Sequence, residues 1–167
     1  MARSQRHGIE RVKFVLGTCA SAKEPWSTEA EKVYLKKITP LIGFEIKKLQ
    51  GKKSDRENQQ QKRKSDSDLL LKEIKEDDYV ILFDEKGEVM DSPRFSQKIN
   101  QCLQSGKKRV LFVIGGAYGV DERVQARAQQ KTSLSKMVFN HLVAQTVVME
   151  QIYRAFAILK NLPYHNE

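Results

Sequence analysis

Two stretches of the sequence carry residue types and spacings that could support chemistry, and the first is a glycine turn. Gly115 and Gly116 directly follow the apolar run Arg109–Ile114, and Gly119 lies three residues further on. Glycines at the end of a strand let a ligand approach the backbone, and ligands in open α/β sheets bind at the carboxyl ends of strands. The turn lacks the G-x-G-x-x-G order of dinucleotide sites and the Gly-Lys-Ser/Thr of the P-loop. A tight strand-to-helix turn that binds nothing is therefore an equal alternative.

The second stretch lies at the end of the chain. Glu150, Tyr153 and Arg154 belong to a long helical pattern, and Tyr164 and His165 follow it. An imidazole ordinarily titrates near neutrality and can accept a proton, whereas a guanidinium stays protonated and can only orient or stabilise an anion. The structural alternatives are an ion pair between Glu150 and Arg154 at four-residue spacing and a frayed chain end.

The framework that must position these groups is predicted by short apolar runs that alternate with helical patterns. Such alternation predicts an α/β fold with a mostly parallel sheet flanked by helices, and 167 residues fit a single domain over 1–167. Ser27 is expected to cap the first helix, and Asp84–Gly87 to end the third strand. Strands are expected at Arg11–Gly17, Phe44–Leu49 (a candidate edge), Tyr79–Phe83 and Arg109–Ile114, with Leu134–Phe139 also extended, and helices at Thr28–Ile38, Gln60–Lys75, Ser92–Gly106, after Asp121 and at His141–Lys160.

Composition excludes several classes of protein. A hydrophobic fraction of 40% excludes full disorder, and because no run approaches 18 apolar residues, no membrane span is expected. The first seven residues lack the apolar core of a signal peptide. Cys19 and Cys102 are expected to be free thiols in a reducing cytoplasm, and no His, Cys, Asp or Glu cluster suggests a metal site.

Positive charge is concentrated in one segment. More than half of the net charge of +9 lies in residues 47–75, which contain ten basic and five acidic side chains. Such a segment on a basic protein is a candidate contact for the phosphates of a nucleic acid. A solvated helix face and loop are an equal alternative, and no nearby aromatic cluster suggests a base-stacking platform.

Four separate runs, in one order and at one spacing, resemble a known family. The sequence is similar to the bacterial large-subunit (23S) ribosomal RNA pseudouridine-N3 methyltransferases of the SPOUT class, densely over residues 110–167 and more loosely before them. The runs are Phe112–Gly119, Ser133–Met137, Glu150–Phe156 and Pro163–His165.

The resemblance implies a fold, a partner and a cofactor. Members of this family thread a deep trefoil knot, here at about residues 110–160, which is a rare exception to unknotted chains. They act as homodimers and bind S-adenosyl-L-methionine in the knot. Residues 1–8 would be an N-terminal extension and residues 161–167 a functional tail. The implied cofactor contacts are Phe83, Gly115, Leu134, Ser135, Lys136, Met137, Val138 and Phe139.

The implied reaction transfers a methyl group to a ring nitrogen of pseudouridine in large-subunit ribosomal RNA within the cytoplasmic ribosome. The resemblance implies functional roles for Arg154, Tyr164 and His165. Arg154 would favour the anionic form of the target base, His165 would accept the proton or contact the substrate, and Tyr164 would stack on or hydrogen-bond the base. A chain end can cross a two-fold axis, so an active site shared between subunits is expected.

Several positions depart from the family pattern. Gln145 stands where an arginine is expected, Asn140 where a proline is usual, and Tyr118 in a loop of smaller residues; the lysines of 47–64 are also unusual. Because of Gln145, a non-catalytic ribosomal-RNA-binding module of the same fold is an alternative hypothesis. Two further hypotheses are a SPOUT enzyme acting on transfer RNA and an unrelated nucleotide-binding α/β protein. The Pro163–His165 ending argues against transfer RNA, and the missing phosphate-binding motifs argue against an unrelated nucleotide-binding protein.

Overall fold

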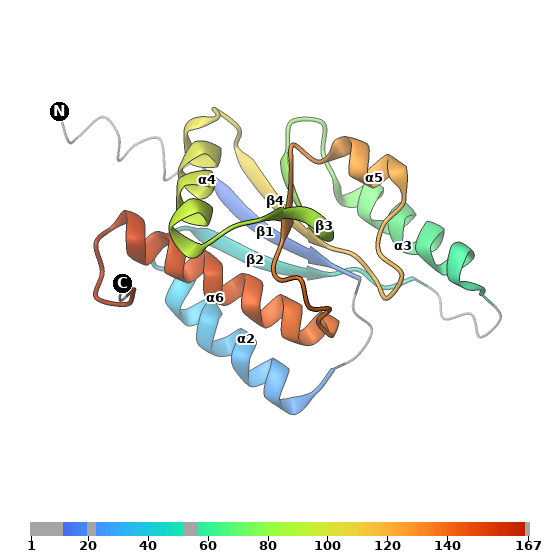
Figure 1. Ribbon diagram of the computed structural model, residues 1–167, viewed down its shortest axis with the longest axis horizontal. Coiled ribbons are helices and arrows are strands. Elements are labelled where there is room, and N and C mark those ends of the chain that lie inside the picture. Colours follow the sequence, from blue (N-terminus) through green and yellow to red (C-terminus); the bar gives the residue numbers. More distant parts are fainter. Residues whose placement is uncertain (1–11, 20–22, 52–56, 166–167) are drawn as a thin grey trace.

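A parallel sheet forms the centre of the protein. The computed structural model describes residues 12–19, 23–51 and 57–165, and within these residues five strands pair in the order β2-β1-β4-β3-β5, all parallel (Figure 1). The α/β fold with a parallel sheet is therefore confirmed. The strands are β1 (Lys13–Thr18), β2 (Gly43–Lys48), β3 (Tyr79–Val89), β4 (Arg109–Ile114) and β5 (Gln130–Ser133).

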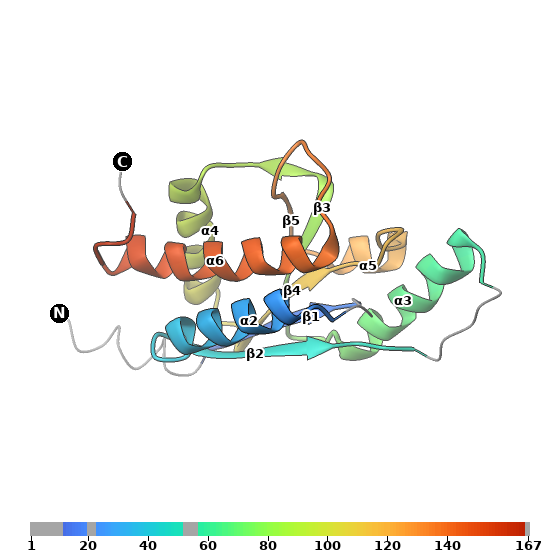
Figure 2. The same ribbon diagram turned by 90° about the horizontal axis from the view of Figure 1, so that it is seen from below.

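Helices cover both faces of the sheet. Three helices pack together on one face and two on the other (Figures 1 and 2). Successive side chains of a strand point to opposite faces, so Phe14 and Phe112 join the first core, and Val15 and Leu111 the second. The first face carries α2 (Pro25–Ile38), α4 (Ser92–Gln104) and α6 (His141–Leu159); the second carries α3 (Gln59–Glu73) and α5 (Glu122–Arg127).

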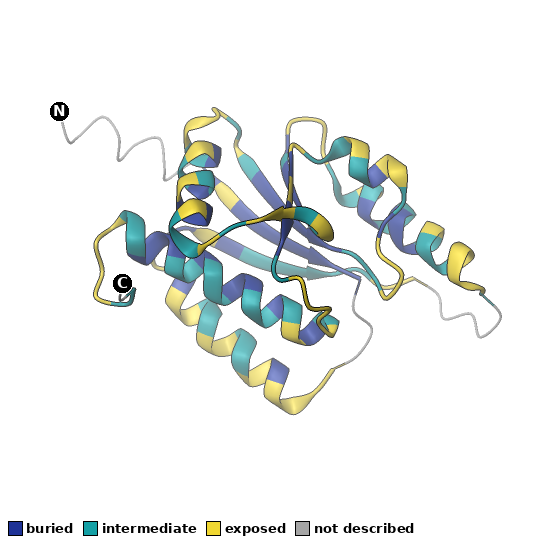
Figure 3. Ribbon diagram, viewed as in Figure 1, coloured by how far each residue is buried: buried dark blue, intermediate teal, exposed yellow. Residues whose placement is uncertain are grey.

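Burial is deepest along the middle strands (Figure 3). The rings of Phe14, Phe112 and Phe156 meet at the centre of the first core, with centroids 5.0 Å apart for Phe14–Phe112 and 5.7 Å for Phe14–Phe156. All three side chains are almost fully buried. Phe156 thereby fixes α6, which carries Glu150, Tyr153 and Arg154, against the sheet.

Some element boundaries differ from those predicted. The first helix begins at Pro25, where the missing N–H of proline costs nothing, and Ser27 lies inside its first turn, where its Oγ accepts the Glu24 N–H at 3.4 Å. β3 does not end at Phe83 but continues to Val89 after a register shift. The prediction that 134–139 is extended was wrong, because this segment is a bent loop; the strand just before it, β5, was not predicted.

Other predictions are confirmed. β2 is an edge strand, as its charged residues suggested. Asp121 caps α5 by accepting the N–H groups of Arg123 and Val124. Both cysteines are free and buried, and burial raises the pKa of each thiol to about 12. The thiols are therefore neutral at physiological pH. The N-terminal extension at residues 1–8 lies outside the described residues.

Helix α6 is long and apolar enough to cross a membrane by length and composition. Eight of its residues are buried against the sheet and its neighbouring helices. A core helix of a globular domain can meet the same criteria of length and composition. Packing therefore accounts for the apolar character of α6.

An ion-pair network fastens the end of the sheet opposite the glycine turn. Arg109 donates to both carboxylate oxygens of Asp78, at 2.8 and 2.6 Å, and to Glu73 at 2.8 Å. Asp78 is 2% exposed. This buried carboxylate is therefore paired with Arg109, and the network links the end of α3 to the starts of β3 and β4.

Replacing Arg109 by alanine is expected to lower the free energy of unfolding by about 3 kcal/mol, because it leaves the buried Asp78 carboxylate unpaired. Denaturant unfolding measures this loss. Lys107→Ala is the matched control, since its ion pair with Asp77 is long, at 3.8 Å, and exposed; such pairs contribute less than about 1 kcal/mol. Equal losses for the two variants would contradict the prediction.

Candidate functional site

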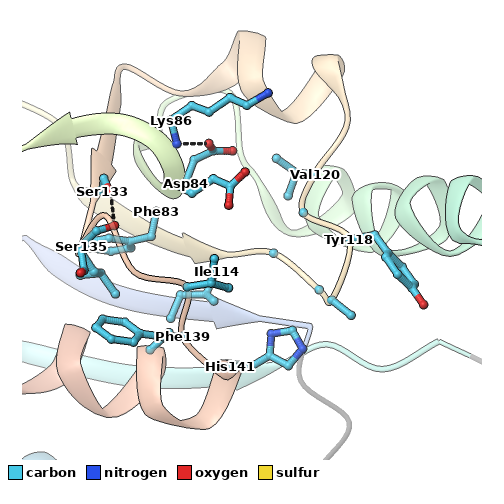
Figure 4. A pocket seen from close by; sticks show the side chains of 18 of the residues that line it. Phe83, Asp84, Lys86, Ile114, Tyr118, Val120, Ser133, Ser135, Phe139 and His141 are labelled. Atoms are coloured by element: carbon cyan, nitrogen blue, oxygen red, sulfur yellow. Dashed lines mark hydrogen bonds between the residues drawn. The ribbon is translucent and has the colours of Figure 1, made fainter.

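A cavity of about 500 Å³ opens at the carboxyl ends of β3, β4 and β5 (Figure 4). Parallel strands meet at one edge there, which is where ligands of such sheets bind. The glycine turn at residues 115–120 forms one wall and the loop at 134–139 another, and the first turn of α6 closes the base. The lining residues include Phe83, Asp84, Ile114, Gly115, Gly116, Val120, Leu134, Ser135, Met137, Phe139, His141 and Ala144.

The glycines of the turn are required by the packing of the protein itself. A Cβ on Gly115 would lie 2.9 Å from Val120 Cγ1, and a Cβ on Gly116 would overlap the carboxylate of Asp66. The turn is closed by the Gly119 N–H, which donates to the Gly116 carbonyl at 3.0 Å. The tight turn and the cavity wall, which the sequence left as competing hypotheses, are the same structure.

The structure brings most of the predicted cofactor contacts to this cavity. Phe83, Gly115 and the loop residues Leu134, Ser135, Met137, Val138 and Phe139 line it, whereas Lys136 is not among the lining residues. Their role as cofactor contacts remains a prediction. Ile114, Val120 and Ala144 were not predicted, although the strand-end rule points to the first of them. Arg63 also lines the cavity, and nothing in the sequence around it indicates this position.

The predicted catalytic residues form a second cluster, centred on Glu150. Arg154 donates to Glu150 Oε1 through Nε at 3.0 Å and Nη2 at 2.7 Å, and the Tyr164 hydroxyl donates to the same oxygen at 3.2 Å. Arg154 Nη1 lies 3.3 Å from His165 Nδ1. The ion pair considered as a structural alternative therefore exists, and the tail is held by the same carboxylate.

Aromatic contacts hold the tail against α6. The Tyr164 ring lies edge-on to Tyr153, with centroids 4.7 Å apart, and the Arg154 guanidinium lies 4.7 Å from its centre. Lys37 Nζ lies 5.2 Å from the centres of both rings. Burial, followed by the charge of Glu150, raises the pKa of Tyr164 to about 12, so its hydroxyl keeps its proton and donates. The hydrogen bonds to Glu150 raise the pKa of Arg154, which stays cationic.

Within one chain the cavity and the Glu150 cluster lie along different parts of α6. The cavity contacts α6 at His141 and Ala144, and the cluster begins at Glu150 and centres on Arg154. Ten residues of helix separate Ala144 from Arg154, which corresponds to about 15 Å. No group of three metal-ligating side chains occurs in residues 12–19, 23–51 or 57–165.

Comparison with known proteins identifies the family. The family model described as "Predicted SPOUT methyltransferase" matches residues 12–165. The chain belongs to the SPOUT methyltransferase family. It is 54% identical to the ribosomal RNA large subunit methyltransferase H of Bdellovibrio bacteriovorus over 93% of this chain and 99% of that protein. Proteins of the same name from Christiangramia forsetii (40% identical, 81% and 87% covered) and Ruminiclostridium cellulolyticum (34%, 92% and 99%) also match.

The departures from the family pattern have local explanations in this SPOUT methyltransferase. Gln145 is buried, with 1% exposed, and its Nε2 donates to Glu31 of α2 at 2.7 Å. The residue that replaces the expected arginine thus faces α2. Asn140 caps α6 by accepting the Leu142 N–H at 2.9 Å. Tyr118 lines the cavity mouth and is half exposed.

Four lysines of the basic segment have acidic partners. Lys62 pairs with Asp66, and Lys64 with Asp68 four residues later. Lys47 pairs with Glu73 at 2.9 Å and Lys48 with Glu31 at 2.6 Å; residues 52–56 lie outside the described part of the chain. Much of the charge counted from the sequence is thus neutralised locally, which favours the structural alternative for these four lysines.

Proposed function

We propose that this SPOUT methyltransferase transfers a methyl group from S-adenosyl-L-methionine to N3 of a pseudouridine in large-subunit ribosomal RNA of the cytoplasmic ribosome. The observation that carries the proposal is the strand-end cavity, enclosed by the glycine turn and the 134–139 loop. It occurs in a chain that is 54% identical over 93% of its length to a protein named for methylation of large-subunit RNA. The Pro163–His165 ending, with its contacts to Glu150 and Arg154, supports the same substrate.

The cavity residues suit this cofactor. Ligand cavities of about 300–1,000 Å³ accommodate molecules of this size, and this one measures about 500 Å³. Ile114, Leu134 and Phe139 offer apolar walls for the adenine ring, and the tightly closed turn leaves backbone groups to hydrogen-bond it. Asp84 and Glu85 at the lining add negative charge opposite a sulfonium cation.

The residues of the tail would prepare the nucleotide for attack. S-adenosyl-L-methionine, when bound, supplies the activated methyl group. N3 of pseudouridine carries a proton and is a poor nucleophile until that proton leaves, and the His165 imidazole is the proposed acceptor. The Arg154 guanidinium would stabilise the resulting anion and orient a carbonyl oxygen by paired hydrogen bonds. The electron pair freed on N3 would then be available to the methyl group that S-adenosyl-L-methionine would supply, with the cofactor sulfur as the leaving group.

Two copies of the chain are proposed to build each active site. In one chain the cavity and the Glu150 cluster are separated by about 15 Å of helix. α2, the loop before α6 and the start of α6 also expose large apolar side chains, namely Trp26, Val33, Phe139 and Val143, with 37–49% of each exposed. A symmetric dimer that covers these side chains could bring the tail of one subunit to the cavity of the other.

A trefoil knot at about residues 110–160 is part of the proposal. The chain leaves β4, forms α5 on one face, passes β3 to add β5 at the sheet edge, and then crosses to the other face as α6. The 134–139 loop on this path runs beside the glycine turn across the cavity. Such a crossing is what threading of the chain through its own loop requires.

Ribosomes that lack the modification are expected to accept a radiolabelled methyl group from S-adenosylmethionine in the presence of this protein. The label should map to N3 of a pseudouridine in the large-subunit RNA, with free ribosomal RNA and transfer RNA as comparison substrates. Label in transfer RNA would favour the alternative substrate. Absence of label from a folded protein that binds ribosomes would favour the non-catalytic module.

A further inference from the structure

Helix α3 makes a series of contacts with the glycine turn that neither the family match nor the proposed reaction accounts for. The Arg63 Nε donates to the Val120 carbonyl at 2.8 Å, and the Asp121 N–H donates to Ser67 Oγ at 2.9 Å. Asp66, which lies between Arg63 and Ser67 on α3, places its carboxylate directly against Gly116. This stretch of α3 therefore contacts both the beginning and the end of the turn.

Asp66 is unusual for a carboxylate on a polar helix. Its side chain is 2% exposed, and Lys62 Nζ pairs with its Oδ1 at 2.5 Å. The hydrogen bond to Asp66 raises the pKa of Lys62, so the ammonium stays charged beside the carboxylate. The Asp66 backbone carbonyl also accepts from Cys19 Sγ at 3.6 Å, just beyond the end of β1. A buried charge is retained only when it is paired, and this pair lies directly behind the wall of the cavity.

We propose that the buried Asp66, paired with the partly exposed Lys62, positions the glycine turn for cofactor binding, and that the affinity of the cavity for S-adenosylmethionine depends on the contact between Asp66 and Gly116. This inference rests on the proposed function. Asp66 acts through the turn and touches no ligand, so it is a positioning residue. Because the backbone of Gly115 and Gly116 lines the cavity, a shift of the turn changes the groups that would contact the cofactor.

The contact predicts a specific coupling between two substitutions. Gly116→Ala forces a methyl group into the Asp66 carboxylate, and Asp66→Ala removes the group that defines the turn. Each is expected to weaken S-adenosylmethionine binding about tenfold, measured by calorimetry. In the double variant the new methyl occupies the space left by the carboxylate, so the combined loss should be well below the roughly hundredfold loss expected for independent sites.

Controls separate positioning from general stability. Asp68→Ala removes an exposed carboxylate from the same helix and should leave the affinity within about twofold. Asp66→Asn keeps the shape of the side chain but removes the ion pair with Lys62. This variant replaces Asp66→Ala in the binding measurement if the alanine variant does not fold. Losses that multiply in the double variant, or a lowered melting temperature with unchanged affinity for S-adenosylmethionine, would overturn the proposal.

Hydrogen exchange gives a readout that needs no ligand. Amides of residues 115–121 should exchange faster in Asp66→Asn than in the native protein, while those of β1 and β4 stay protected. If the native protein failed to bind S-adenosylmethionine, the proposed function would be wrong, and unchanged exchange at 115–121 would then separately reject the role of Asp66 in shaping the turn.

Discussion

Deletion of residues 164–167 is expected to lower the methyl-transfer rate by about a thousandfold while the protein remains folded. The deletion removes Tyr164 and His165, whose side chains contact Glu150, Tyr153 and Arg154 on the surface of α6 and Lys37 of α2. The Tyr164 and His165 side chains belong to neither of the two cores that cover the sheet. The deletion removes the proposed proton acceptor, His165, and the tail contacts that help to order the Arg154 guanidinium. Together these losses account for a factor of this size.

The rate should be measured under single-turnover conditions with saturating S-adenosylmethionine, and the fold by thermal unfolding. Deletion of Asn166 and Glu167 alone is the matched control and should leave the rate nearly unchanged, because both predicted functional side chains are retained. A truncated protein that loses its cooperative unfolding transition would show instead that the tail is structural. A truncated protein that retains full activity would remove Tyr164 and His165 from the mechanism.

The fold was predictable where local patterns and tertiary structure agree. Tyr79–Phe83 and Arg109–Ile114 are continuous apolar runs because their strands lie in the middle of the sheet and are covered on both faces. β5 was missed because Gln130–Ser133 is a short polar strand, although three of its four residues are buried. Its buried Gln130 and Thr132 side chains hydrogen-bond each other at 2.9 Å, which no local propensity indicates.

The candidate site was predictable only in part. The strand-end rule places Phe83 and Gly115 at a ligand cavity without reference to any family. The loop at 134–139 has no such signal, and only the resemblance pointed to it. Asp66 and Arg63 were overlooked because α3 has almost no amphipathic pattern, and its buried positions include the polar residues Asp66 and Ser67. The contacts of Arg63 with Val120 and of Asp66 with Gly116 join segments about fifty residues apart in the sequence.

Heterodimers built from two inactive variants are expected to recover about half of the native activity. Ala144→Phe would fill the cavity from the first turn of α6, and deletion of 164–167 removes the tail. In a heterodimer, the tail of the Ala144→Phe subunit can serve the intact cavity of the truncated subunit. One of the two shared sites is then complete, which gives about half of the native rate per dimer.

The experiment requires co-expression of the two variants with different affinity tags and purification through both tags. Heterodimers of Ala144→Phe with a second cavity variant, Gly115→Val, are the matched control and should stay inactive, since no intact cavity is present. If the tail instead serves the cavity of its own chain, the first heterodimer contains no complete site and remains at background. The recovered rate therefore decides between a site shared by two subunits and a tail that must cross about 15 Å between Arg154 and Ala144 within one chain.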